Sequence, residues 1–380
     1  MSKVVVLQCN EYDPEKIYQK LKWGLDQLGG IESIIPKQKK TLLKPNMLVA
    51  SAKEKAATTH PAVFEAVARI MKENEYNTTF GDSPGFGNPE KVAQKTGILE
   101  VANKYDIPIA DFVNGKKESF PNGTVCKQFD IANGILEADA IINLPKMKAH
   151  ALQRITGAIK NPFGAVIGYN KGAMHSRFTN AFNFAEMIID LNNYLKVDLH
   201  IMDGIIAMEG NGPRNGDPVP MNVLLISTDP VALDTVFCKL IDISPMLIPT
   251  ITFGQMYGLG SYENIEIIGE DIEPLVNKEF NIERVELKKE DSMKLSFLKS
   301  VIRKPYIIED ICKKCGICVE VCPLEDKALT FKNGDKTKPP VYDYKKCIRC
   351  YCCQEMCPYE VIKVKTPTIG KILYGLKLLK

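Results

Sequence analysis

The chain has 380 residues, of which 45% are hydrophobic and 25% are charged. This is the composition of a soluble globular protein of two or three domains, and it excludes a fully disordered chain, a collagen and a coiled coil. The 49 basic and 46 acidic residues leave a net charge of only +3, which is too even for a protein that coats nucleic acid.

Residues 1–270 are predicted to form an α/β domain, because short apolar runs alternate with helical patterns. The predicted strands are Val4–Leu7, Thr41–Leu43, Thr78–Phe80, Ile107–Ala110, Ala140–Leu144, Leu199–Met202 and Val223–Ile226. The predicted helices begin near Pro14 and Pro61 and cover Pro89–Tyr105, Asn183–Tyr194 and Pro230–Leu240. Strands separated by helices favour a mostly parallel sheet with helices on both faces.

Three shorter segments are predicted after this domain. Residues 271–304 are charged and weakly periodic, as in a connector, with one short helix expected over Met293–Ile302. Residues 305–366 hold most of the cysteines. Residues 367–380 place apolar side chains on one helical stripe with lysines beside it, which predicts a basic amphipathic tail. Such a tail packs on its own protein or meets a membrane surface.

Targeting signals are not evident in the sequence. The first residues lack the apolar centre of a secretory signal, and no run approaches the ~20 apolar residues that span a bilayer. We therefore expect a cytoplasmic protein with reduced thiols and no transmembrane segment. In that compartment clustered cysteines indicate metal binding or catalysis rather than disulfides.

Two cysteine quartets share the spacing C-x2-C-x2-C-x3-C, and each is followed by proline. The second quartet repeats the first after 35 residues, which indicates an internal duplication. Two-residue gaps let three thiolates of one loop bind three irons of a cubane, while the fourth reaches the cubane of the other half. Two [4Fe-4S] clusters are therefore predicted. Their ligands are Cys312, Cys315, Cys318 and Cys357 for one cluster and Cys347, Cys350, Cys353 and Cys322 for the other.

The alternative for these quartets is a pair of structural zinc sites, which also use C-x2-C pairs. Zinc ribbons need neither the third closely spaced cysteine nor the C-x3-C-P ending, so iron–sulfur is the favoured interpretation. Cys352 breaks the two-residue spacing, and we expect it to be a packed thiol rather than a ligand.

Residues 305–366 resemble a bacterial-type two-cluster ferredoxin, a small α+β domain. That resemblance implies low-potential one-electron transfer with a redox partner protein. Residues 305–380 carry fourteen basic and nine acidic side chains, whereas free ferredoxins of this type are acidic. The basic balance favours a fixed electron-transfer module, or one that docks an acidic donor, over a freely diffusing carrier.

Polar residues follow several predicted strands of the α/β domain, where ligands of open α/β sheets collect. Substrate-binding candidates in these loops are Lys44, Asn46, Asp82, Ser83 and Asn161. Catalytic candidates, expected on consecutive loops, are Lys146, Lys148, His150 and Lys160. The three lysines would form a cationic pocket for a carboxylate or phosphate, with His150 as a general acid. The alternative is a solvated basic surface.

Four strings in this domain occur in a fixed order: Lys-Pro-Asn at residue 44, Gly-Asp-Ser-Pro-Gly at residue 81, Leu-Pro-Lys-x-Lys-x-His at residue 144 and Lys-Asn-Pro-Phe-Gly at residue 160. Together they resemble the domain-of-unknown-function 362 family over roughly residues 40–240. That resemblance implies association with redox proteins of anaerobic metabolism, and it supplies no catalytic residues.

Three functions remain open from the sequence. The first is a ferredoxin-linked oxidoreductase or a component of one, in which electrons reach a small anionic substrate at the α/β domain. The second is an electron carrier whose α/β domain only docks redox partners. The third is a redox-neutral protein whose clusters are structural or sensory.

Overall fold

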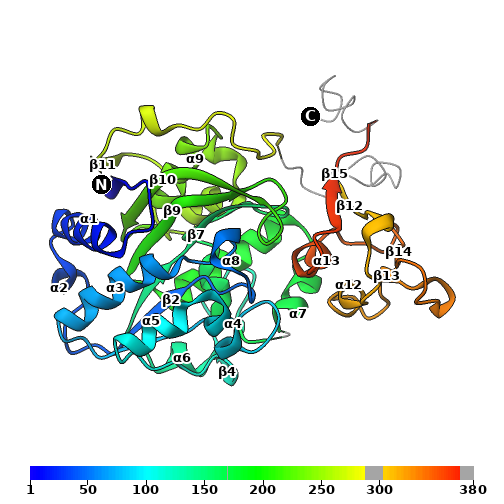
Figure 1. The fold of residues 1–380 in the computed structure, drawn as a ribbon, viewed down its shortest axis with the longest axis horizontal. Coiled ribbons are helices and arrows are strands. Elements are labelled where there is room, and N and C mark those ends of the chain that lie inside the picture. The colour runs from blue at the N-terminus through cyan, green and yellow to red at the C-terminus, as the bar shows by residue number, and fades with distance from the viewer. Residues whose placement is uncertain (169, 287–302, 369–380) are drawn as a thin grey trace. The chain divides into compact units, whose positions relative to one another are not determined.

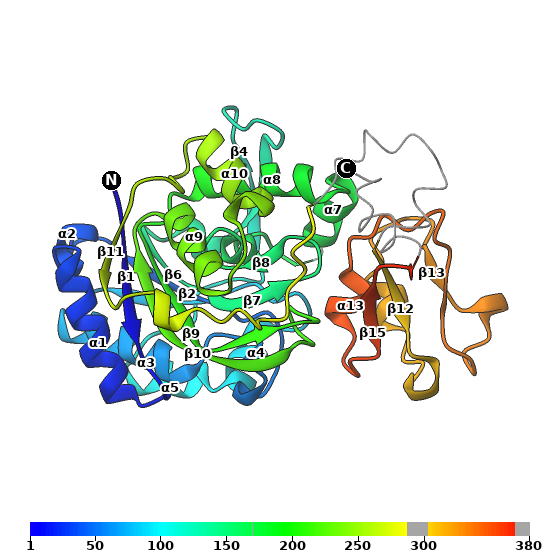
Figure 2. The same ribbon diagram turned by 90° about the horizontal axis from the view of Figure 1, so that it is seen from above.

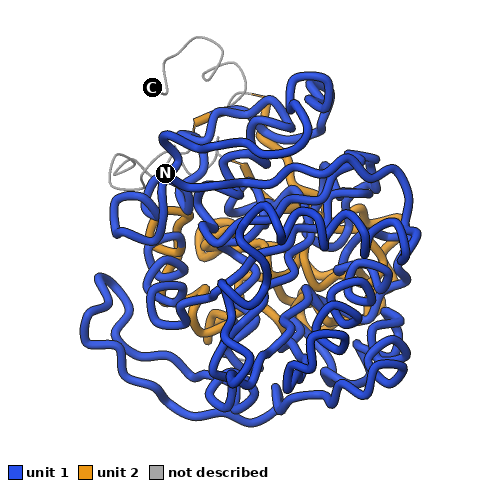
Figure 3. Tube along the Cα trace, turned by 90° about the vertical axis from the view of Figure 1, so that its left-hand side faces the viewer, with its two compact units in different colours: residues 1–171, 185–285 blue, residues 172–184, 286–380 orange. Residues whose placement is uncertain are grey.

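The computed structural model describes residues 1–168, 170–286 and 303–368. It divides into two compact units, one formed by Met1–Lys171 and Ala185–Val285, the other by Gly172–Phe184 and Glu286–Lys380 (Figure 3). The helix expected over Met293–Ile302 and nearly all of the expected tail lie outside the described residues. Within the described part of the chain, no helix has both the length and the apolar character needed to cross a membrane.

The first unit is built on a nine-stranded sheet with the strand order β11-β1-β10-β9-β6-β2-β3, to which β7 and β8 add beside β9 (Figure 1). All neighbouring pairs are parallel except those of β10 with β1 and β9, and β7 with β8. The mostly parallel α/β sheet expected from the sequence is thus confirmed. Its strands are β1 (Ser2–Gln8), β2 (Thr41–Pro45), β3 (Thr78–Phe80), β6 (Ala140–Leu144), β7 (Lys146–His150), β8 (Arg154–Thr156), β9 (Leu199–Glu209), β10 (Asp217–Ser227) and β11 (Ile265–Gly269).

Helices cover both faces of this sheet (Figure 2). One face carries α1 (Pro14–Gln27), α3 (Pro61–Glu73) and α5 (Ile98–Lys104). The other carries α8 (Ala181–Leu195), α9 (Pro230–Leu240) and α10 (Pro249–Met256). Shorter elements of the unit are α2 (Ile31–Ile34), α4 (Pro89–Thr96), α6 (Asn133–Leu136) and the hairpin β4 (Gly115–Ser119) with β5 (Gln128–Ala132). The helix α7 (Asn170–Arg177) begins in this unit and continues into the second.

Helix starts follow local sequence signals. Asp229 caps α9 by accepting from the N–H groups of Val231 and Ala232, and Pro230 takes the first helical position. This arrangement satisfies N–H groups that lack a partner within the helix. α9 therefore begins and ends at the predicted residues.

Several predicted elements differ from the structure, among them the strand expected over Val223–Ile226, which in β10 already begins at Asp217. The helix expected over Pro89–Tyr105 is two helices, because Gly97 adopts φ 82° and ends α4. The strand expected over Ile107–Ala110 is reduced to a single bridge between Ile109 and Phe80. The strand expected to end at Met202 runs on to Glu209, because its second half pairs with β7 and β10.

The second unit contains two halves with the same local backbone. It includes β12 (Lys304–Ile307) paired with β15 (Ile362–Lys365), β13 (Leu329–Thr330) paired with β14 (Val341–Tyr342), and the short helices α12 (Ile317–Glu320) and α13 (Cys352–Met356). The positive φ angles of Lys314 and Gly316 recur 35 residues later at Arg349 and Tyr351. The duplication read from the cysteine spacing is therefore also a duplication of conformation.

Candidate functional site

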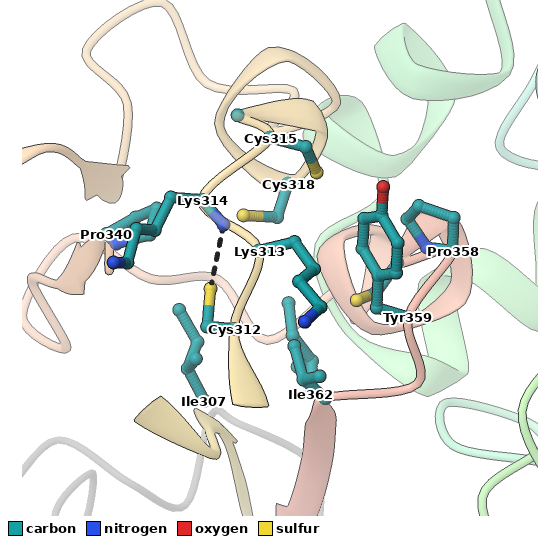
Figure 4. Close-up of a pocket in the computed structure, with 13 residues that line it drawn as sticks. Ile307, Cys312, Lys313, Lys314, Cys315, Cys318, Pro340, Pro358, Tyr359 and Ile362 are labelled. Atoms are coloured by element: carbon teal, nitrogen blue, oxygen red, sulfur yellow. Dashed lines mark hydrogen bonds between the residues drawn. The ribbon is translucent and has the colours of Figure 1, made fainter. Parts of the chain in front are cut away.

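The eight quartet cysteines of the second unit line two cavities. Cys312, Cys315 and Cys318 line the first (Figure 4). Cys357 from the other half lines the same cavity. The second cavity is lined in the same crossed way by Cys347, Cys350, Cys353 and Cys322. The structure thus brings together the two sets of four that the spacing predicts.

The thiols of each set are close enough to perturb one another. Burial, followed by the charges of Cys357, Cys315 and Cys312, raises the pKa of Cys318 to about 12. In the second cavity burial also raises the pKa of Cys347 and Cys353, and neighbouring thiols add to both effects. Four thiolates gathered in this way repel each other unless a cation accompanies them, so the donor set fits a positively charged metal group.

The form of the cavities fits a cubane better than a single ion. A cubane takes one thiolate at each of its irons, so its ligands surround a volume. Zinc instead draws four sulfurs to within about 2.3 Å of one point. In the described residues, no group of three or more His, Cys, Asp or Glu side chains is placed to hold one metal ion.

Further polar contacts reach the ligand sulfurs. The Lys314 N–H donates to Cys312 Sγ at 3.4 Å (Figure 4), and the Tyr342 hydroxyl lies 3.2 Å from Cys353 Sγ. Burial beside Cys353 raises the pKa of Tyr342, which keeps the hydroxyl protonated. Cys352 is buried, as expected for a packed thiol, and its hydrogen bond to Cys350 is the main cause that lowers the pKa of Cys350.

In the first unit, the four sequence strings meet in one buried hydrogen-bond network at the carboxyl ends of the parallel strands. Lys44 Nζ binds Asp82 Oδ1 at 2.7 Å and the Asn161 carbonyl at 2.8 Å. Asn161 in turn contacts Asn46 and Asn143, each at 2.7 Å. Four of the five substrate-binding candidates therefore lie together, and they bind one another.

Gly164, in the fourth string, shows how closely the chain packs around this ion pair. A Cβ atom at this position would lie 2.7 Å from Lys44 Nζ and still closer to Asp82 Oδ1. Only glycine leaves room for the backbone here. The fifth candidate, Ser83, accepts hydrogen bonds from Lys171 Nζ at 2.7 Å and from the Gly168 N–H at 3.2 Å. Burial lowers the pKa of Lys171 to about 7.

The expectation that Lys146, Lys148 and His150 lie on loops is wrong. All three are buried on strand β7, where alternate residues share one face. The alternative of a solvated basic surface is excluded for these three side chains for the same reason. Lys160, at the start of the Asn161–Ala165 turn, is half-buried, with Nζ 5.9 Å from the centre of the Phe163 ring.

Each of the three buried side chains is engaged inside the protein. Lys146 Nζ contacts Asp203 Oδ2 and the Tyr12 hydroxyl, both at 2.7 Å, and burial lowers its pKa. Lys148 Nζ donates to Asn46 Oδ1 at 3.1 Å and to the Ala57 carbonyl at 2.7 Å. His150 Nδ1 accepts from two backbone N–H groups of the following turn.

Sequence reasoning missed several members of this network. Tyr12 stacks on His60 with ring centres 3.5 Å apart and donates to Asp203 Oδ1 at 2.9 Å. His200 is fully buried beside Asn143, with Nδ1 3.0 Å from the Asn143 amide nitrogen. The partners in these hydrogen bonds are separated by more than fifty residues in sequence, so no local pattern could reveal them.

Comparison with known proteins identifies both parts of the chain. The family model described as Domain of unknown function (DUF362) matches residues 41–239, and a 4Fe-4S dicluster domain matches residues 311–361. A thylakoid-associated protein of Synechocystis sp. is 34% identical over 264 residues, which cover 68% of this chain and 80% of that protein.

Two further likenesses are partial. One component of the H(2):CoB-CoM heterodisulfide,ferredoxin reductase of Methanothermobacter thermautotrophicus is 35% identical over 123 residues, which are 29% of this chain and 16% of that polypeptide. The lactate racemase apoprotein of Thermoanaerobacterium thermosaccharolyticum superposes with a TM-score of 0.40 and 13% identity, over 60% of this chain and 55% of that one.

Proposed function

Because the chain belongs to the DUF362 family and carries a 4Fe-4S dicluster domain, we propose that it is an electron-transfer protein with two [4Fe-4S] clusters. The observation that carries this proposal is the crossed arrangement of four thiols around each of two cavities. When bound, such clusters supply one-electron transfer at low potential. The protein would work in a reducing, cytoplasmic compartment and in anaerobic metabolism.

The ligand sets we propose are those that line the cavities. Cys312, Cys315 and Cys318 come from one tight loop, whose turn is made by Lys314 and Gly316 at positive φ. Cys357 completes the first set from the far half, and Cys322 completes the second set in the same way. The chain's contribution is to fix these eight thiols and to bury five of the cysteines, whereas Cys315 is exposed.

The α/β domain would supply the substrate or partner for this electron transfer. A small anion at the carboxyl edge of the sheet is the first form of the proposal, because Lys44, Lys146 and Lys148 are concentrated there and the half-buried Lys160 directly precedes Asn161 of the same network. The protein would then be a ferredoxin-linked oxidoreductase or a component of one.

A second form treats the α/β domain as a docking module for redox partners. It is favoured by the contacts of Lys44 and Lys146, each of which holds a buried carboxylate inside the domain. An ion pair of this kind neutralises the charge that would attract a substrate. The two forms differ in whether the full chain binds a small anion.

The iron content of anaerobically purified protein tests the central proposal. About eight irons and eight sulfides per chain are expected from two cubanes. The Cys315→Ser variant should lose about half of this iron, since it removes one ligand of one set. The matched Cys352→Ser variant should retain all of it, because Cys352 belongs to neither set. Colourless protein with zinc in place of iron would refute the proposal.

Calorimetric titration of the same preparation distinguishes an α/β domain that binds a small anion from one that only docks redox partners. Saturable binding of inorganic phosphate or succinate, lost in the Lys160→Gln variant, would support the anion site. An absence of binding, together with specific retention of a redox protein, would support docking.

A further inference from the structure

The two halves of the second unit carry different residues at one pair of equivalent positions, and each of these two residues lines the cavity of its own half. Tyr342 lines the second cavity, and the residue 35 positions earlier, Ile307, lines the first. Each stands five residues before the first cysteine of its quartet and at the C-terminal end of a short strand, β14 or β12. At this equivalent place the second cavity has a phenol with a hydroxyl group, and the first has an aliphatic side chain with no polar group.

The Tyr342 hydroxyl is directed at a predicted cluster ligand. Its oxygen lies 3.2 Å from Cys353 Sγ, which is within hydrogen-bonding distance for sulfur. A thiolate bound to iron has no proton to give, so the hydroxyl must be the donor once the cluster is bound.

The neighbouring tyrosine fixes this hydroxyl in place. The ring of Tyr344 stacks on that of Tyr342 with centres 5.3 Å apart and an interplanar angle of 13°. The Tyr344 hydroxyl donates to the Pro305 carbonyl at 2.8 Å, and Lys304 Nζ lies 4.3 Å from the centre of the same ring. The ring of Tyr342 is thus held against a neighbour that is itself anchored, so the hydrogen bond to the cysteine is preorganised.

We infer that Tyr342 raises the reduction potential of the cluster held by Cys347, Cys350, Cys353 and Cys322, and of that cluster alone. The inference rests on the function proposed above. Reduction adds one electron and hence one negative charge to the cluster, part of which resides on the ligand sulfurs. A hydroxyl that donates to such a sulfur stabilises the reduced form more than the oxidised form. Ile307 has no group that can do the same at the other cluster.

Other groups also act on the two potentials, so the effect of Tyr342 must be measured on a single cluster before and after substitution. Lys313 and Lys314 line the first cavity, and the Lys314 N–H donates to Cys312 Sγ. Positive charge and hydrogen bonds at that cluster raise its own potential. They remain unchanged when Tyr342 is altered, because they belong to the other half.

The test is a dithionite titration of the full chain, followed by electron paramagnetic resonance, for the Tyr342→Phe variant. Phenylalanine keeps the ring and its stacking but removes the donor. The equilibrium constant for reduction of the cluster next to Tyr342 should fall by about tenfold, because the variant loses one charge-assisted hydrogen bond to that cluster. The equilibrium constant for reduction of the other cluster should stay the same. For a one-electron couple a tenfold change corresponds to about 59 mV.

Tyr344→Phe is the matched control, because it removes a hydroxyl that reaches a carbonyl and no sulfur, while the ring keeps its stacking on Tyr342 and its contact with Lys304, which are sufficient to hold Tyr342 in place. Both potentials should then remain within the error of the wild type. Two unchanged potentials in Tyr342→Phe, an equal shift of both, or an upward shift would overturn the inference.

A second measurement compares the vibrational spectra of the clusters in H2O and in D2O. The iron–sulfur stretching frequencies of the wild-type protein should change between H2O and D2O at the cluster that accepts the exchangeable hydroxyl proton, and Tyr342→Phe should lose that part of the change. Full iron content with identical spectra in both solvents would refute the role of Tyr342 while leaving the proposed function intact. Protein without iron would refute both.

Discussion

Replacing His200 with asparagine should remove one contribution by which acidification destabilises the first unit. Burial lowers the pKa of His200 to about 3, and the ring is fully buried. Asn143 uses Oδ1 to accept from Asn161, so its amide nitrogen faces His200 Nδ1 and the imidazole carries its proton on Nε2. The folded protein therefore keeps this side chain neutral throughout the mildly acidic range.

The sign and size of the effect of His200 on the free energy of unfolding follow from proton linkage. The unfolded chain binds a proton at His200 near pH 6.5, whereas the folded chain does so only near pH 3. Between these values the unfolded state binds more protons, so the free energy of unfolding falls as the pH falls. From pH 7 to pH 5 this single side chain accounts for about 2 kcal/mol.

Urea denaturation at several pH values measures this slope. Trp23, the only tryptophan in the chain, lies on α1, so its fluorescence reports on the first unit. The cavity left by asparagine lowers stability at every pH, but the difference between pH 7 and pH 5 should shrink by about 2 kcal/mol. His60, which is only partly buried, has its pKa lowered to about 4 and contributes a slope of the same sign that the variant retains. If the free energies of unfolding at pH 7 and pH 5 differ by the same amount in the variant and in the wild type, the contribution assigned to His200 is refuted.

Two further substitutions test the buried network by the same fluorescence assay. Lys146→Met leaves the Asp203 carboxylate buried without its cation and should cost about 3 to 5 kcal/mol, whereas Lys104→Met, which removes an exposed lysine from its pair with the partly buried Glu65, should cost much less; equal costs would contradict the reasoning. Gly164→Ala forces a methyl group onto the Lys44–Asp82 ion pair and should cost at least about 1 to 3 kcal/mol, and a neutral result would show that the loop can move aside.

Local signals predicted much of the fold and of the cluster site. The start of α9 follows from Asp229 and Pro230, because a cap and a fixed φ act within one helical turn. The crossed sets of cysteines follow from spacing, because two-residue gaps restrict where three sulfurs of one loop can point. In both cases the determining interactions lie within a few residues, or within one repeat.

The buried lysines could not be placed in this way. Lys146 and Lys148 have the sequence character of a basic surface, and only the strand pairing of β7 with β9 carries Lys146 to Asp203, 57 residues away. Gly204 is typical of a strand end, but in the structure it lets β9 pass close to Met147. A Cβ atom at residue 204 would lie 2.8 Å from the terminal methyl carbon of Met147. Long-range packing decides such positions, and a single sequence does not display it.

Each half of the second unit contributes one thiol to the cavity of the other half, and this arrangement has a consequence for biogenesis. A nascent chain that has emerged only as far as Pro340 presents three sulfurs of the first cavity and one of the second. The second cavity is complete only once Cys353 has left the ribosome, and the first only once Cys357 has followed, so neither proposed cluster can find its full set of four thiols before the second quartet is translated. Premature termination anywhere before Cys353 would leave both cavities short of at least one thiol.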